Sequence, residues 1–301
     1  MNILIVGGTG MIGGNTALLL REQGHEVTLM SRSRPTSQAL ADFDFIATNY
    51  LTDDCRNGRL DGFDSLVFAA AADLRMLPQD GSVTPEQFYE QANTVAVPKF
   101  FEAAKAAGMR RAVYIGSFYP QVAPQRIAVC PYVKSRHLAD EAVRAMSCDS
   151  FVTCSLNAPF VLGQLPGLEI PHLGALIQYA RGEFAGLPVF APEGGTNHMT
   201  AGSLAEAVSG ALARGVGGTP YLIGDVNYSW KEYLELWFDA VGKPAELEVR
   251  AEDHPMLPNV MMFAGVGATV SYEPNPEETA LLGYSRGHLG QEIAEVVAAL
   301  G

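Results

Sequence analysis

Short apolar runs alternate along the first half of the chain with longer stretches in which apolar residues recur at helical spacing. Continuous apolar runs of this length suit buried strands. The predicted strands cover residues 3–6, 26–30, 43–47, 65–69, 112–116 and 151–156. The periodic stretches predict helices at residues 11–21, 85–107 and about 132–146. Strands that alternate with helices are typical of an α/β protein.

The second half gives a weaker pattern. Predicted helices cover residues 172–181, 203–214, 230–241 and 289–300, the last on the surface, and a predicted strand at 220–223 returns to the main sheet. Trp230, Tyr233, Leu234 and Trp237 share one helical face, which indicates core before ligand site. The segment 255–270 is apolar and rich in methionine and glycine. It is a candidate to cover a substrate or to form a subunit contact in a homodimer, with plain packing as the default.

Three glycines stand three residues apart between the first strand and the first helix. One of them suits a sharp turn, one lets backbone amides approach a pyrophosphate, and one lets the helix pack closely on the strand. The positive end of the helix then faces the phosphates. Because the triplet directly follows a strand and opens a helix, we predict a dinucleotide site in preference to a plain structural turn. Its predicted contacts are Gly7, Thr9, Gly10, Met11, Ile12 and Gly13.

The second strand leads into Ser31, Arg32, Ser33 and Arg34. A dinucleotide fold that binds NAD usually places an acidic residue here for the ribose hydroxyls, whereas an arginine accommodates a 2′-phosphate. Arg32 or Arg34 with Ser31 can bind that phosphate, so the sequence favours NADP over NAD. The alternative is two ordinary solvated arginines in a loop.

Small or isolated polar residues mark three further positions. Ala69, Ala70 and Ala71 follow the fourth strand, where small side chains let the cofactor lie across the strand ends. Asp53 is expected to cap a helix, with an adenine contact as the alternative. Asn93 lies inside a helix rich in alanine and phenylalanine, and taken alone such a residue is usually on the surface.

A serine and a tyrosine form the candidate reaction centre. Ser117 ends the fifth strand, and Tyr132 begins the helix that follows. Helix positions four apart share a face, whereas positions two apart diverge by about 200°, so Arg136 lies beside Tyr132 and Lys134 does not. A fixed positive charge stabilises a phenolate, which a general acid or base acting on a hydroxyl or carbonyl requires. Ser117 can hydrogen-bond the same oxygen.

Composition excludes several classes of partner. The 301 residues include 20 lysines and arginines against 33 aspartates and glutamates, and the net charge of -13 disfavours nucleic acid and acidic membrane surfaces. No basic or cleavable apolar segment precedes the first strand and no apolar run reaches membrane-spanning length, so we expect a soluble, cytoplasmic protein. The cysteines lack the spacing of a metal site, and we expect neither a metal nor a disulfide. They are Cys55, Cys130, Cys148 and Cys154.

These motifs together resemble the extended short-chain dehydrogenase/reductases, also described as NAD-dependent epimerase/dehydratases. The resemblance spans nearly the whole chain. Besides the glycine turn it rests on Asn93-Thr-Val, Ser117, Tyr132-x-x-Ser135, the run 158–163, Leu204-Ala-Glu-Ala207 and Leu281-Leu-Gly-Tyr284.

The resemblance implies a Rossmann-type doubly wound parallel sheet with a smaller C-terminal substrate lobe. The dinucleotide-binding domain would cover residues 1–156 with a return segment at about 197–224, and the interleaved lobe mainly residues 157–301. Residues 187–190 and 197–200 resemble short strands of that lobe.

The same resemblance implies the roles of the site residues. Ser117 would orient the substrate oxygen, Tyr132 would transfer the proton, Asn93 would support the proton relay, and Pro159 and Phe160 would lie near the nicotinamide. His172 and His198 are further candidates for the pocket, although packed or surface histidines are the more common case.

Two positions depart from the family pattern. The family carries lysine four residues after the tyrosine, and this chain carries Arg136. Arginine keeps the charge and can bond the nicotinamide ribose, but it does not release a proton near neutral pH. Asn49-Tyr50 stands where the family tends to carry an aspartate, which affects the predicted adenine contact.

Three functions follow from these observations. The first is an NADP-dependent oxidoreductase that moves a hydride between the nicotinamide and a carbonyl or secondary alcohol of a small-molecule substrate, with Tyr132 as general acid or base. The second is a nucleotide-sugar epimerase or dehydratase, which would more usually hold NAD. The third is a cofactor-binding sensor or partner protein that has lost catalysis through Arg136.

Overall fold

The computed structural model describes residues 1–72, 76–78 and 80–300. All strands of its main sheet are parallel. Its strands, in spatial order, are β10 (Pro220–Leu222), β6 (Val152–Ala158), β5 (Arg111–Ser117), β4 (Ser65–Phe68), β1 (Asn2–Val6), β2 (Glu26–Ser31) and β3 (Asp44–Ala47). The order confirms the predicted α/β doubly wound sheet. From β1 the chain runs outward to β3 and then returns to β4, so the direction reverses between β1 and β4. Ligands of such sheets bind at the carboxyl ends of the strands beside this reversal.

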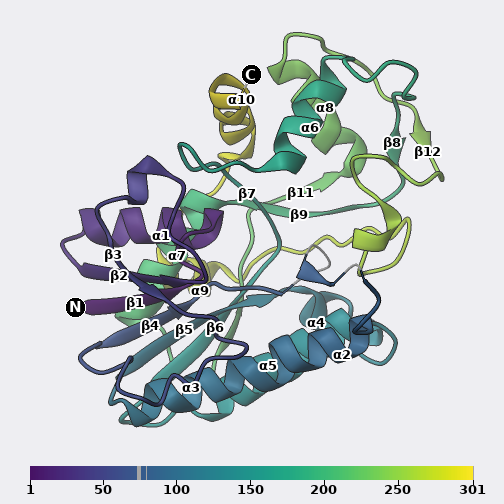
Figure 1. Cartoon of the computed structure of the whole chain (residues 1–301). Helices are drawn as coiled ribbons and strands as arrows, with labels where there is room; N and C mark the ends of the chain where they lie inside the picture. Colours follow the sequence, from purple (N-terminus) through teal and green to yellow (C-terminus); the bar gives the residue numbers. More distant parts are fainter. Residues whose placement is uncertain (73–75, 79, 301) are drawn as a thin grey trace.

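Helices cover both faces of the main sheet (Figure 1). One face carries α1 (Met11–Glu22) and α7 (Ala201–Arg214), and the other carries α3 (Ala96–Ala106) and α5 (Pro131–Ala145). Successive residues of β1 enter different cores because strand side chains alternate in direction: Ile3 and Ile5 join the first core, and Leu4 and Val6 the second. This two-sided burial explains why the strands read as continuous apolar runs.

The C-terminal lobe has its own core above the edge of the main sheet (Figure 1). Two small sheets run through it, one ordered β11 (Val226–Ser229), β9 (Gly195–Thr200) and β7 (Phe160–Leu162), the other formed by β12 (Val249–Arg250) and β8 (Ala191–Pro192). Its helices are α6 (Pro171–Ala180), α8 (Trp230–Ala240) and α10 (Leu289–Leu300), whereas α9 (Pro276–Leu282) packs against α7 and adds Leu282 to the first core of the main sheet. The aromatic stripe of α8 is buried as core, as predicted. One face of α10 is also buried, through Leu289, Ile293 and Val296.

Three predictions about elements need correction. Residues 85–107 do not form one regular helix: α2 (Pro85–Tyr89) and α3 are joined by η3 (Glu90–Val95), a π-helical turn. Residues 187–190 are not a strand, because the pairing begins only at the next residue, Ala191, in β8. Asp53 caps no helix; a turn of residues 49–53 stands there.

The return of the chain from the lobe to the main sheet is confirmed for β10, which pairs in parallel with β6. β9, which contains residues 197–200, pairs instead with β7 and β11 in the lobe. The proposed division between residues 156 and 157 stays a prediction.

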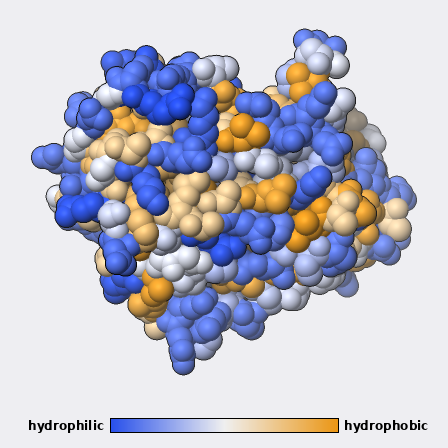
Figure 2. Space-filling view, turned by 90° about the horizontal axis from the view of Figure 1, so that it is seen from below, coloured by the Kyte–Doolittle hydropathy of each residue, from blue (hydrophilic) through white to orange (hydrophobic). Residues whose placement is uncertain are grey.

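The outer surface carries both apolar and hydrophilic residues. On the face that carries α3 and α5, apolar groups are interspersed with hydrophilic ones (Figure 2), and the exposed Val95 and Leu138 belong to η3 and α5. Within the described part of the chain, no helix combines the length and the apolar composition needed to cross a bilayer.

Candidate functional site

The glycine turn is fixed by contacts between backbone atoms. Gly7 has a φ of 78°, and a Cβ added there would lie 2.6 Å from the Ala70 nitrogen. A Cβ at Gly13 would lie 2.3 Å from the Gly7 oxygen. Gly10 is different: it is exposed, and its added Cβ would meet only the Gly7 oxygen, at 3.5 Å. The protein itself therefore explains Gly7 and Gly13, whereas Gly10 leaves open space at the start of α1.

The polar residues after β2 lie beside this turn. The Thr9 hydroxyl donates to the Ser31 hydroxyl over 2.9 Å, which ties the turn to the end of β2. Arg32 and Arg34 are exposed, and the Arg34 guanidinium lies 5.4 Å from the centre of the Phe45 ring. The predicted group Ser31, Arg32 and Arg34 is thus at the same edge of the sheet as the glycine turn.

The small residues after β4 face the turn from the other side. Ala69 and Ala70 are partly buried and Ala71 is exposed. The close approach of Gly7 to Ala70 shows that β1 and β4 are in backbone contact where their strands end. Met11 and Ile12, in the first turn of α1, are partly exposed.

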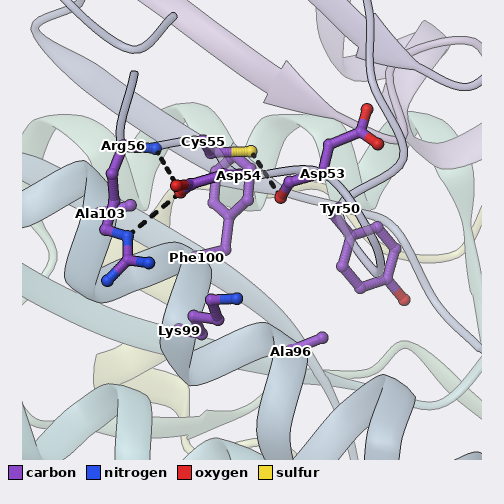
Figure 3. A pocket seen from close by; sticks show the side chains of 9 residues that line it. All are labelled: Tyr50, Asp53, Asp54, Cys55, Arg56, Ala96, Lys99, Phe100 and Ala103. Atoms are coloured by element: carbon purple, nitrogen blue, oxygen red, sulfur yellow. Dashed lines mark hydrogen bonds and ion pairs between the residues drawn. The ribbon is translucent and has the colours of Figure 1, made fainter. Parts of the chain in front are cut away.

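The loop after β3 forms one wall of a small pocket against α3 (Figure 3). Asp53 accepts a hydrogen bond from the Asn49 nitrogen over 3.0 Å, so its carboxylate is occupied in closing the turn. The Tyr50 ring meets the Phe68 ring edge-on, with centroids 5.2 Å apart. Burial raises the pKa of Tyr50, against the effect of the Arg136 charge, and keeps the hydroxyl neutral. A contact of Asp53 with adenine stays a prediction.

Tyr132 stands in the first turn of α5, directly after Pro131. Proline is favoured there because its missing N–H has no helical acceptor to lose. The partly buried ring stacks on Phe263, with centroids 4.1 Å apart and planes inclined by 22°. The rings of Tyr89 and Tyr119 meet it edge-on at 5.4 and 6.5 Å. The tyrosine therefore lies in an aromatic environment that α2, the end of β5 and the C-terminal segment build together.

Asn93 is not on the surface, as its isolated position in the sequence suggested, but completely buried. Its amide donates to the Ser135 hydroxyl over 3.1 Å, and that hydroxyl donates to the Tyr132 carbonyl over 2.8 Å. The other side-chain atom, Asn93 Oδ1, has no partner in the described protein. The π-helical turn brings this about, because its extra residue re-aims the side chain toward α5; such turns are frequent at functional sites.

Arg136 lies one turn after Tyr132 and is 3% exposed. Its Nη2 donates to the Ile115 carbonyl over 2.7 Å, and its guanidinium carbon lies 5.1 Å from the centre of the Tyr114 ring. Nε and Nη1 have no hydrogen-bond acceptor in the described chain. A buried charge with two unused donors is costly. This position therefore points to an acceptor that the protein does not supply.

Ser117 is the last residue of β5 and is almost fully buried. It pairs with Ala158 of β6, and the next residue, Phe118, contacts the Tyr119 ring at 4.2 Å. Through Tyr119 the strand end is linked to the Tyr132 ring. Serine and tyrosine thus lie in neighbouring elements at the carboxyl edge of the sheet.

Two other predicted residues face elsewhere. The ring of Phe160 lies 5.5 to 5.9 Å from the rings of His198, Trp230 and Tyr233 in the lobe core. Pro159 is buried between β6 and β7. Their contact with a nicotinamide stays a prediction.

The histidines and cysteines add no chemistry to this edge. Burial lowers the pKa of His198 to about 3, so its ring is neutral and packs on Tyr233 at 4.7 Å. His172 is exposed at the start of α6. The four cysteines are free, and the described residues contain no group of three or more His, Cys, Asp or Glu side chains that could hold a metal ion.

The sequence did not predict four aromatic neighbours of the reaction centre, which are Tyr89, Tyr114, Tyr119 and Phe263. Tyr114 and Tyr119 lie in a strand and a proline-rich loop, and Phe263 is 131 positions after Tyr132 (263 minus 132). The one available signal was the methionine- and glycine-rich composition of residues 255–270, which marked the segment but not the residue.

The residues present fit a dinucleotide. Gly10 leaves space at a helix N-terminus, Ser31 and two arginines border that space, and the unused donors of Arg136 suit ribose hydroxyls. The glycine turn and Ser31 would hold the phosphates and the adenosine ribose, and Arg136 would hold the nicotinamide ribose.

Comparisons with known proteins identify the family of the chain. The model of the NAD dependent epimerase/dehydratase family matches residues 3–224. A search of curated proteins found no match.

Among solved structures, the chain is similar to UDP-N-acetylglucosamine 4-epimerase from Bacillus cereus, with 15% identity, a TM-score of 0.73, and 99% of this chain and 96% of that chain covered. It is similar to UDP-glucose-4-epimerase from Stenotrophomonas maltophila with bound NAD and formylated UDP-arabinopyranose: 14% identity, TM-score 0.76, coverage 100% and 98%. It is also similar to dTDP-glucose 4,6-dehydratase from Streptomyces venezuelae with NAD bound: 18% identity, TM-score 0.74, coverage 99% and 96%. At these identities the likeness shows the fold.

Proposed function

Because the chain belongs to the NAD-dependent epimerase/dehydratase family, we propose that it is an NAD(P)-dependent enzyme that interconverts a carbonyl and a secondary alcohol. The observation that carries the proposal is the cluster around Tyr132. Asn93 and Ser135 hold the start of α5, and Arg136 places a buried positive charge one turn away. A bound nicotinamide supplies the hydride chemistry.

The chain's own residues then have distinct roles. The Tyr132 hydroxyl donates a proton to the substrate oxygen, or accepts one from it, and Ser117 orients that oxygen. Arg136 stabilises negative charge on the tyrosine oxygen and donates to a ribose hydroxyl, but it keeps its own proton. The proton that Tyr132 gives must therefore be replaced from water, and the unpartnered Asn93 Oδ1 can accept a hydrogen bond from such a water.

For the cofactor we propose NADP in preference to NAD. The support is local: Ser31 stands at the end of β2, where an acidic residue would repel a 2′-phosphate, and Arg32 and Arg34 follow it in exposed positions. Two of the three relatives described above were solved with NAD, so cofactor preference has to be measured on this chain.

A nucleotide-sugar epimerase or dehydratase is the second candidate, and the comparisons favour it over a simple reductase. All three relatives described above are enzymes of that kind. In such a reaction the cofactor is reduced and reoxidised in one turnover. Net consumption of NADPH or NADH supports the reductase, whereas turnover with no net consumption and a tightly retained nucleotide supports the epimerase or dehydratase.

The test of the shared chemistry is Tyr132→Phe, which removes the hydroxyl and keeps the ring stacked on Phe263. We expect turnover to fall on the order of 10²- to 10⁴-fold, with the NADP⁺ dissociation constant from fluorescence titration unchanged. Tyr228→Phe, in β11, removes a tyrosine hydroxyl away from this edge and serves as the control. Turnover by Tyr132→Phe at the wild-type rate would overturn the proposal, as would a wild-type protein that binds neither cofactor.

A further inference from the structure

The surroundings of Tyr132 are unusually rich in aromatic rings for a site that acts on sugars. We define the aromatic cluster as the rings that are linked in a chain of contacts around it: Tyr89, Phe118, Tyr119, Tyr132, Phe263 and Tyr272. They come from α2, from the end of β5 with α4 (Tyr119–Val122), from α5, and from the C-terminal segment. Four of them are only partly buried, so they offer accessible ring surface at the reaction centre.

The geometry of the aromatic cluster suits a flat ring. Phe263 already lies nearly parallel to Tyr132 at 4.1 Å, and Tyr119 meets Phe263 edge-on at 5.7 Å with planes inclined by 79°. Parallel and edge-on contacts at these spacings are the two arrangements that aromatic pairs prefer. Burial also raises the pKa of Tyr119, so its hydroxyl stays neutral and adds no charge.

A side-chain hydrogen bond to its carbonyl oxygen holds Phe263 in this place. The Arg126 Nε, in η4 (Pro124–Arg126), donates to the Phe263 carbonyl over 2.9 Å. The same segment exposes Val260, Met261 and Val266, which are 63%, 41% and 65% exposed. Apolar side chains of this segment are thus open to solvent.

Three arginines of the C-terminal half of the chain have partners within the described protein. Arg214 donates to the Leu281 and Leu282 carbonyls. Arg250 pairs with Glu248 over 2.7 Å, and Arg286 pairs with Glu273 over 3.0 Å. A diphosphate is best recognised by arginines free to donate in pairs, and these three have other partners.

We propose that the substrate is a planar aromatic carbonyl compound or the corresponding secondary alcohol, and that Phe263 is a specificity residue that packs on its ring. The inference rests on the proposed function. In the reducing direction the carbonyl carbon accepts a hydride from the reduced nicotinamide, the C=O π pair moves to oxygen, and that oxygen takes the Tyr132 proton. The products are the alcohol and the oxidised cofactor, and the tyrosinate regains a proton from water.

The test compares three probes on the full-length protein in the presence of NADP⁺ or NADPH: 2-acetylnaphthalene, cyclohexanone and UDP-glucose. Dissociation constants come from calorimetry with NADP⁺, and turnover from NADPH oxidation and product analysis. We expect the naphthyl ketone to bind tightest. Phe263→Leu keeps an apolar side chain but removes the ring, so it should weaken binding of the naphthyl ketone by up to about tenfold and leave cyclohexanone within about twofold. Val260→Ala, on the exposed side of the same segment, should change neither.

Different outcomes of this experiment reject the aromatic substrate and the proposed function. Tighter binding of UDP-glucose than of the naphthyl ketone overturns the aromatic substrate, and so does an equal loss for both ketones in Phe263→Leu. Tyr132-dependent turnover of UDP-glucose or cyclohexanone, without binding of the naphthyl ketone, rejects the inference and leaves the proposed function in place. Failure of the wild-type protein to bind NADP⁺ or NADPH rejects both.

Discussion

The glycine turn and the tyrosine site lie at the same edge of the sheet but are built in different ways. At the turn, backbone lies against backbone: the hydrogen atoms of Gly7 and Gly13 are the only side chains that the 2.6 and 2.3 Å approaches leave room for. At the tyrosine site, rings from several segments pack around Tyr132, and Arg136, one helical turn away against the Tyr114 ring, is a buried cation with two unused donors. The first arrangement is complete without a ligand. The second contains polar groups whose partners the protein does not provide.

This difference predicts that substitutions in the two regions have opposite effects on stability. A single methyl group in the turn should unfold the protein or block the cofactor, depending on which glycine carries it. Removal of a large charged side chain at the tyrosine site should cost little stability and much activity.

The largest effect is expected from the pair Gly13→Ala and Gly10→Ala. The new methyl at residue 13 would overlap the Gly7 carbonyl, which is backbone and cannot swing away, so we expect a loss of about 3 kcal/mol in the free energy of unfolding. At residue 10 the methyl has ordinary contact distances and a φ of -86°, so stability should stay within about 0.5 kcal/mol. Dinucleotide binding should nevertheless fall on the order of 100-fold, because the methyl occupies the space that a pyrophosphate needs.

Chemical denaturation and fluorescence titration of both variants measure these quantities. If Gly10→Ala binds NADP⁺ and NAD⁺ as tightly as the wild type does, the phosphates do not lie against this turn, and the glycine triplet is structural. A stable Gly13→Ala would show instead that the turn can relax.

A smaller effect is expected from Arg136→Met, which replaces the buried cation with an apolar chain of similar length. The lost hydrogen bond to the Ile115 carbonyl costs about 1 kcal/mol, and relief of the unpaired buried charge offsets it. The free energy of unfolding should therefore change little. Turnover should fall on the order of 100-fold, in the range seen when one preorganised donor is removed from a site.

Arg136→Lys is the matched control for Arg136→Met, since it keeps the positive charge and loses the planar guanidinium group. We expect it to retain more activity than Arg136→Met. Equal activity of the wild type and Arg136→Met would mean that the arginine serves structure alone. A wild-type protein that binds the cofactor but turns over no substrate is instead what a cofactor-binding sensor without catalysis would show.

The same contrast explains what could be predicted from the sequence. The glycine turn, the strand that precedes it and the helix that follows are contiguous in the sequence, so a local pattern specifies them, and the ends of the chain's first strands were predicted to within one residue. The strand predicted at residues 220–223 was also assigned correctly to the main sheet, where β10 pairs with β6. Asn93 could not be placed, since a polar residue in a helix looks the same whether the helix is regular or widened by a π turn.

Phe263 was beyond prediction for a different reason. Its position against Tyr132 depends on the path of an irregular segment, which the Arg126 side chain and turns within residues 254–268 fix, and none of these contacts has a periodic signature. The strand predicted at residues 187–190 was wrong because apolar composition alone does not show where pairing partners lie. Local sequence patterns thus predict the strands of the sheet, whereas they do not show which distant residues meet at the reaction centre.

The smallest effect is expected from a substitution of Arg32, beside the glycine turn. Arg32 is exposed at the end of β2 and lies near the space that Gly10 leaves open, so Arg32→Ala should weaken NADP⁺ binding by about tenfold and leave NAD⁺ binding unchanged. Arg21→Ala is the control, because this arginine covers the Phe43 ring at 4.0 Å near the far end of α1. Salt should narrow the gap between wild type and Arg32→Ala, since an exposed ion pair is screened. An equal loss for both cofactors would mean that Arg32 contacts a part that they share, and the preference for NADP would then have to come from Arg34 or be abandoned.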